Sequence, residues 1–149
     1  MTNSAGETPK LSKLQVAVHQ LGVAIRLFLE EDYLSSLTLA GAAEEVLGKL
    51  SEKAGLPVAI KDIAEFHRKD VDPAIPVEKQ EKTIADILNK ARNAAKHVVS
   101  SDDVAFAVEQ IHPLQMIMRA MPMARRLGLP PAGEAEMVAW IRAHPEATQ

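Results

Sequence analysis

The apolar residues of this chain recur with the period of an α-helix, and we find no strand-like alternation of apolar and polar residues. Near the N-terminus they follow steps of four and three, at Leu14, Val18, Leu21, Ile25 and Phe28. This spacing places them along one face of a helix. Only 3% of the residues are aromatic, so Leu, Ile, Val, Ala and Met must fill the core, as in closely packed helices. The pattern predicts an all-α protein.

We expect an antiparallel helical bundle of four to five main helices plus a short C-terminal helix. A first helix covers about residues 12–30, a second ends at Gly55 as its C-cap, and a third covers about residues 77–99. A fourth begins near Ser101. The predicted core residues are Leu14, Val18, Leu21, Ile25, Leu39, Val46, Leu50, Ile84, Leu88, Ala91 and Ala95.

The chain of 149 residues has the length of a single domain. We expect residues 1–10 to be a disordered tail, residues 11–127 to form the bundle, and residues 128–149 to form a loop and a short helix that presents Met137, Trp140 and Ile141. A proline-rich excursion with a short helix at about residues 60–69 joins the second and third helices. In the fourth, Pro113 and Pro122 are expected to kink or divide the chain.

Charge and composition exclude several function classes. The net charge is −3, whereas dedicated nucleic-acid binders carry an excess of Lys and Arg, so contact with RNA would need a local basic patch. The absence of cysteine excludes disulfides, thiolate catalysis and cysteine zinc sites. The first residues lack the apolar stretch of a signal peptide, and no apolar run approaches the roughly 20 residues of a membrane span. We therefore expect a cytoplasmic protein with no membrane contact.

Polar residues gather near the end of the predicted third helix. Asn89, Asn93 and His97 follow one another at steps of four, with Arg92 and Lys96 beside them. Asn93 can touch both Asn89 and His97, whereas Arg92 and His97 lie about 140° apart around a helix. One interpretation is a solvated polar face. The other is a site, because Asn is unfavourable inside a helix and the imidazole lies among cations.

The segment RNAAKH, from Arg92 to His97, resembles the R-N-x-x-x-H motif of the HEPN superfamily. The expected all-α bundle agrees, and the resemblance covers roughly Leu11 to Met118. It implies a metal-independent endoribonuclease that acts as a homodimer, often a toxin paired with a nucleotidyltransferase-like antitoxin. By position, Arg92 and His97 match the family's defining pair and Asn93 its usual polar neighbour.

The chemistry that this resemblance implies suits the residue types. An imidazole at His97 would accept the proton of a ribose 2′-OH, and a guanidinium at Arg92 would bind the anionic phosphorane through two oxygens. Asn93 would orient the ring or hold the phosphate, and Lys96 would add positive charge. We expect Lys96, Asn89 and Glu44 to contribute to substrate binding, with no metal and no cofactor.

Glu44 lies at the edge of the wide apolar arc of the second helix. It could pair with Arg92 and hold its guanidinium. It could equally be an edge residue whose carboxylate reaches water, and we favour that interpretation because carboxylates are rarely fully buried. The wide arc, together with the Met-rich segment at residues 116–126, suggests a homodimer. We assign this Met-rich segment to packing or to the dimer interface rather than to RNA contact.

Other patterns favour structural roles. Glu109 and His112 form an E-x-x-H, the spacing that binds one iron in ferritin-like bundles, but the sequence has no second copy. His19 and His67 lack ligand-spaced neighbours on their own helices. The leading hypothesis is therefore a HEPN-like endoribonuclease acting through Arg92, Asn93 and His97. The alternative is a non-catalytic HEPN-like module that binds a nucleotide or a partner and is associated with a nucleotidyltransferase.

Overall fold

The computed structural model describes residues 8, 10–58, 73–96, 105 and 107–148. Within this part of the chain there is no strand, and the elements are α1 (Lys13–Leu29), α2 (Tyr33–Lys53), α4 (Val77–Leu88), α5 (Lys90–Lys96), α6 (Ile111–Arg126), α7 (Glu134–Ala143) and a 3-10 turn, η2 (Pro145–Thr148). The predicted all-α bundle is confirmed. The short helix expected at about residues 60–69 lies outside the described residues. No helix in the described ranges is long and apolar enough to cross a membrane.

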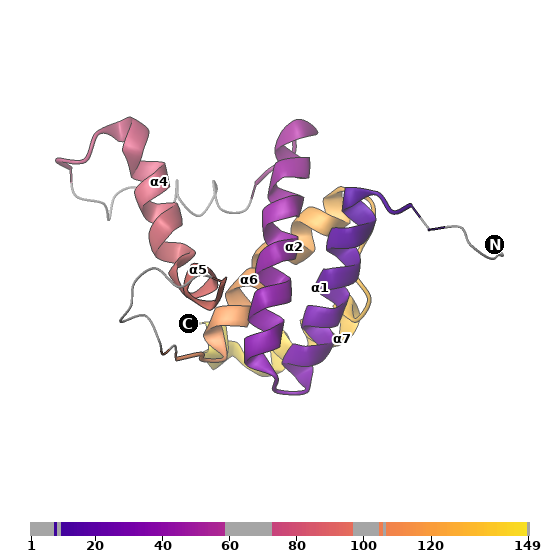
Figure 1. The fold of residues 1–149 in the computed structure, drawn as a ribbon. Helices are drawn as coiled ribbons and strands as arrows, with labels where there is room; N and C mark the ends of the chain where they lie inside the picture. The colour runs from indigo at the N-terminus through magenta and orange to yellow at the C-terminus, as the bar shows by residue number, and fades with distance from the viewer. Residues whose placement is uncertain (1–7, 9, 59–72, 97–104, 106, 149) are drawn as a thin grey trace.

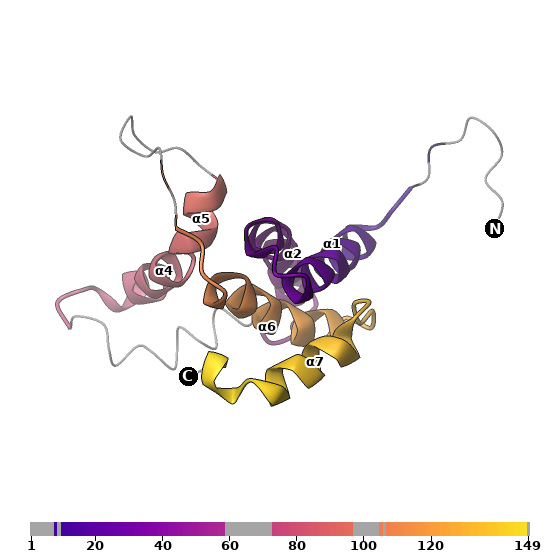
Figure 2. The same cartoon turned by 90° about the horizontal axis from the view of Figure 1, so that it is seen from below.

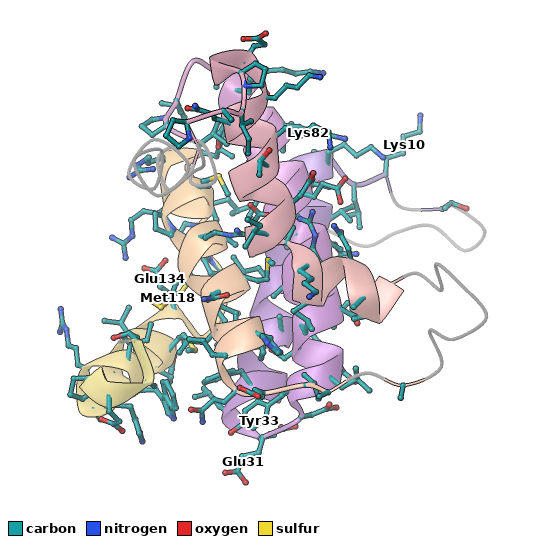
Figure 3. The ribbon with its side chains drawn as sticks, turned by 90° about the vertical axis from the view of Figure 1, so that its left-hand side faces the viewer. Lys10, Glu31, Tyr33, Lys82, Met118 and Glu134 are labelled. Carbon is teal, nitrogen blue, oxygen red and sulfur yellow. The ribbon has the colours of Figure 1, made fainter. Side chains whose placement is uncertain are left out.

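Helices α1 and α2 form an antiparallel hairpin whose ends are set by local hydrogen bonds (Figure 1). Ser12 caps α1, because its Oγ accepts from the N–H of Gln15 while the Gln15 Oε1 accepts from the N–H of Ser12. Glu31 turns the chain with a positive φ of 68°, and Figure 3 shows its side chain pointing away from the helices. Asp32 then caps α2 by accepting from the N–H of Ser35.

The core lies where α6 packs against the α1–α2 hairpin (Figures 1 and 2). Its fully buried large side chains include Leu21, Ile25, Phe28, Leu37, Leu47, Leu114, Ile117 and Met123. Of the predicted core, Val18 is also buried, and five more pack partly buried against it: Leu14, Leu39, Val46, Ala91 and Ala95. The side chains of Ile84 and Leu88 are outside the described part of the structure.

Helix α7 returns the chain to α1 and completes the bundle. Met137 is fully buried, and Trp140 and Ile141 are partly buried. The Phe28 ring of α1 and the Trp140 ring are edge to face, with centroids 4.8 Å apart, and the His144 ring stacks on Trp140 at a centroid distance of 4.1 Å.

Helices α4 and α5 lie on the side of α2 away from α1 in both ribbon views (Figures 1 and 2). The prediction of one continuous helix over residues 77–99 is wrong, because α4 ends at Leu88 and α5 begins at Lys90. Asn89 between them is the C-cap of α4, and its backbone N–H donates to the carbonyl of Ala85. The low helix propensity of Asn permits this break. Since α5 packs against α2, the break determines where Arg92 lies.

The second half of the chain also differs from the prediction. Residues 105 and 107–110 are not helical, and α6 begins at Ile111 rather than near Ser101, which lies outside the described residues. Neither proline divides α6. Pro113 lies in the first turn, where a backbone N–H has no intrahelical acceptor, so its absence costs little. Pro122 is exposed, so the carbonyl one turn before it, which lacks a donor, can bind water.

Candidate functional site

The candidate site is built around Arg92, on the face of α5 that packs against α2. The backbone N–H of Asn93 donates to the carbonyl of Asn89 at 2.9 Å, so the first turn of α5 starts directly at the break. The stem of Arg92 then crosses α2 at Gly41, where there is no side chain. A β-carbon at residue 41 would lie 2.6 Å from both Cγ and Cδ of Arg92. Gly41 therefore creates the space in which Arg92 lies.

Glu44, one turn after Gly41 on α2, receives this guanidinium. The distance from Arg92 Nη1 to Glu44 Oε2 is 2.9 Å, and the two side chains are 11% and 5% exposed. The interpretation of Glu44 as an edge residue that reaches water is therefore wrong. The carboxylate can be buried because it is paired with a cation.

Arg119 of α6 is a second cation at the same carboxylate. Its Nη2 lies 3.6 Å from Glu44 Oε2, donates to Asn89 Oδ1 at 2.7 Å, and contacts Met116 Sδ at 2.8 Å. Burial lowers the pKa of Arg119 from its ordinary value; the Glu44 carboxylate opposes this shift, and the positive charge of Arg92 adds to it. Arg119 of α6 thus contacts both Asn89, between α4 and α5, and Glu44 on α2.

We refer to Glu44, Asn89, Arg92 and Arg119 as the arginine cluster. It holds two guanidinium groups and one carboxylate. The Nε atoms of Arg92 and Arg119 are buried, and neither has a hydrogen-bond partner among the described residues. Removing one member of such a buried ion pair is strongly destabilising, because the remaining charge is left without compensation. The cluster therefore fixes α5 to both α2 and α6.

Only part of the predicted site comes together in this cluster. Asn89, Arg92 and Glu44 meet there, whereas Asn93 is exposed. Lys96 ends α5, but its side chain is not among those described, and His97 lies outside the described residues. The relation between Arg92 and His97 therefore stays a prediction.

Two cavities flank α5. The smaller, about 180 Å³, opens beside the cluster and is lined by Glu44, Glu45, Gly48, Lys49, Glu52, Val58, Asn89 and Arg92. Its lining has three carboxylates and two cations, Lys49 and Arg92, so it offers no excess of positive charge to a polyanion. The larger cavity, about 500 Å³, lies between helices α4 and α5 and the start of α6. It is lined by Ile87, Lys90, Ala91, Ala94, Ala107, Ile111, His112 and Gln115. No carboxylate lines this second cavity among the described residues, so it is the more favourable of the two for an anion.

The E-x-x-H pair has a structural role within the described part of the chain. The backbone N–H of Glu109 donates to His112 Nδ1 at 3.1 Å, which ties the His112 ring to the start of α6. No group of three His, Cys, Asp or Glu side chains among the described residues could hold a metal ion.

Arg119 is the cluster member that sequence reasoning missed. From the sequence, the whole Met-rich segment at residues 116–126 is assigned to packing or to the dimer interface, and Arg119 is not singled out. Its spacing carried a signal, because Arg119 lies three residues after Met116 and four before Met123, on the apolar stripe of α6. A cation on a buried stripe requires a buried acid, and Glu44 is that acid.

Comparison with known proteins adds no assignment: no family model, no curated protein and no solved structure matches this chain.

Proposed function

We propose that this chain is a HEPN-like helical module that binds a nucleotide or a partner protein, as an associate of a nucleotidyltransferase, and does not itself cleave RNA. The observation that carries the proposal is the buried ion pair between Arg92 and Glu44, 2.9 Å apart. A catalytic guanidinium needs its planar edge free to grip two phosphate oxygens. In this protein the guanidinium of Arg92 contacts a carboxylate on the neighbouring helix.

The surroundings of Arg92 support the same conclusion. The cavity that it lines contains the carboxylates of Glu44, Glu45 and Glu52 against the cations of Lys49 and Arg92, so it offers no excess of positive charge to an RNA backbone. Asn93 is exposed, whereas Arg92 is only 11% exposed, so the two neighbours in the motif do not face one ligand. Arg92 is better explained as the residue that docks α5.

The cavity between α5 and α6 supports the nucleotide part of the proposal. Lys90 supplies a cation for a phosphate, and Gln115 supplies amide hydrogen-bonding groups for a base edge. Ala91, Ala94 and Ile111 provide apolar walls against which a base can pack. A volume of about 500 Å³ lies within the range of small-molecule sites.

Endoribonuclease activity is the second candidate, and Arg119 is the observation that favours it. Because Arg119 Nη2 lies 3.6 Å from Glu44 Oε2, the carboxylate would keep a cationic partner if Arg92 moved towards a substrate. Under this hypothesis His97 is the general base, and a homodimer brings the motif residues of two copies together.

A binding and cleavage experiment separates the two candidates. Fluorescence anisotropy with fluorescently labelled adenosine monophosphate and with a short labelled RNA should detect binding. A gel assay of the same RNA should detect no cleavage product, with or without a chelator. Lys90→Gln should weaken binding about tenfold, since a charge-assisted contact is lost. Lys53→Gln, on the exposed last turn of α2, is the matched control and should bind like wild type.

One kind of cleavage product would contradict the proposal. Product that forms in the presence of chelator, carries a 2′,3′-cyclic phosphate and disappears in His97→Ala would establish the endoribonuclease instead. Absence of both binding and cleavage with wild-type protein would contradict nucleotide binding as well as the endoribonuclease.

A further inference from the structure

A separate groove lies between α1 and the segment that joins α6 to α7. Its volume is about 610 Å³, and its lining residues are Gln15, Val18, His19, Gly22, Val23, Ile25, Arg26, Leu29, Leu129, Ala132, Gly133 and Glu136. The volume lies within the range of small-molecule sites. None of its lining residues belongs to the arginine cluster.

Gly22 brings the two walls of this groove together. A β-carbon on Gly22 would lie 3.4 Å from the β-carbon and the backbone nitrogen of Ala132, so the joining segment packs directly against the helix there. Around this contact the walls are mainly aliphatic, with Val18, Val23 and Leu129 among them. No Phe, Tyr or Trp side chain lines the groove within the described residues, so its walls favour an aliphatic ligand.

The polar residues on the α1 wall form one stripe. Gln15, His19, Gly22 and Arg26 follow at steps of four, three and four, and therefore share a face of the helix. The side chains of His19 and Arg26 are exposed, and neither forms an ion pair with another described residue. Arg26 is thus a cation beside an apolar surface, and no carboxylate of the described residues is paired with it.

We propose that this groove binds an aliphatic monocarboxylate, with its carboxylate on Arg26 and its alkyl chain against the valine and leucine side chains. Charge complementarity supports this ligand, because a carboxylate accepts two parallel hydrogen bonds from a guanidinium. Glu136, from the first turn of α7, lines the same groove and repels any anion, a doubly charged phosphate more strongly than a monocarboxylate. The apolar walls remove the alkyl chain from water.

Trp140 provides a readout for this site. It is the single tryptophan of the chain, and it lies one helical turn after Glu136 on α7. Decanoate titrated into the full-length protein below its micellar concentration should change the tryptophan fluorescence saturably. Decanol, which lacks the charge, and decyl phosphate, which carries more of it, should both bind more weakly.

Variants of two arginines test the proposed contact. Arg26→Gln should weaken decanoate binding about tenfold, because one charge-assisted interaction is lost while the apolar walls remain. Arg142→Gln changes an exposed arginine of α7 that does not line the groove, and it should bind decanoate like wild type. Far-UV circular dichroism should show equal helix content in both variants.

Changes in amide chemical shifts locate the bound decanoate independently of the tryptophan fluorescence. On addition of decanoate, the largest shifts should fall on groove residues such as Gly22, Val23 and Ala132. Equal affinity of wild type and Arg26→Gln, preference for decanol over decanoate, or shifts concentrated on α4 and α5 would each overturn the proposal.

Discussion

Arg92 of α5 lies across Gly41 of α2, so the two helices approach each other at a position where α2 has no side chain. A β-carbon on residue 41 would be 2.6 Å from the Cγ and Cδ of Arg92, a distance that real β-carbons do not tolerate. The guanidinium beyond this point is bound to Glu44 at 2.9 Å. The contact of Arg92 with Gly41 and its ion pair with Glu44 are therefore coupled, and the contact requires glycine at residue 41.

Gly41→Ala should lower the free energy of unfolding by about 1–3 kcal/mol, the usual cost of an added group in a packed interior. The added methyl must displace the stem of Arg92 and so strain or break its ion pair with Glu44. Urea unfolding followed by circular dichroism measures the change.

Gly48→Ala is the matched control on the same helix. Among the described residues its β-carbon would meet Val58 Cγ1 alone, at 3.8 Å, an ordinary contact. Alanine favours a helix interior over glycine, so this variant should gain up to about 1 kcal/mol. Equal effects of the two substitutions would show that Arg92 does not lie over Gly41.

Glu44→Ala should lower the free energy of unfolding by about 3–5 kcal/mol, because Arg92 and Arg119 would be left buried without an anion. The same substitution in an Arg119→Met background should cost less, since only one cation then loses its partner. A double-mutant cycle in urea measures this coupling.

Glu45→Ala provides the control for this prediction. Glu45 forms a surface pair with Lys49 at 3.9 Å, in which its own side chain is 43% exposed. Exposed pairs contribute little, so this loss should stay below about 1 kcal/mol. Additive effects of Glu44→Ala and Arg119→Met would contradict the shared ion pair.

The chain is expected to form a homodimer in which the α4–α5 arm lies at or near the interface. Ile87 of α4 is 68% exposed and lines the cavity beside α5, and contact with a second copy would remove this apolar side chain from water. Sedimentation at micromolar concentration should give about twice the chain mass of 16.2 kDa.

Ile87→Glu should shift this protein towards the monomer, because a carboxylate would have to be buried in the interface. Leu34→Glu, at a 51% exposed position of α2, should leave the dimer intact. A wild-type protein that sediments as a monomer would contradict the dimer.

Three of the four cluster residues are named from the sequence, as candidates for catalysis or substrate binding, but their arrangement is not. Asn89 and Arg92 were singled out by their polarity inside an apolar pattern, and Glu44 by its place at the edge of the apolar arc of α2. Periodicity places residues around one helix but does not show which helix they face. It could therefore not decide whether Glu44 reached water or a cation, nor pair it with Arg119.

The sequence by itself determined the helical class, the α1 and α2 boundaries to within about two residues, and most of the buried stripe of α1. These follow from local interactions, namely the period of the apolar residues, the Ser12 cap and the Gly55 turn. Only the tertiary structure decided that the predicted third helix breaks at Asn89, that α6 continues through Pro122, and that two arginines share Glu44. The pairing of two arginines with Glu44 depends on neighbours distant in sequence, since a buried charge is costly unless it is paired. The continuation of α6 through Pro122 depends on exposure, since a carbonyl without an intrahelical partner can bind water at the surface.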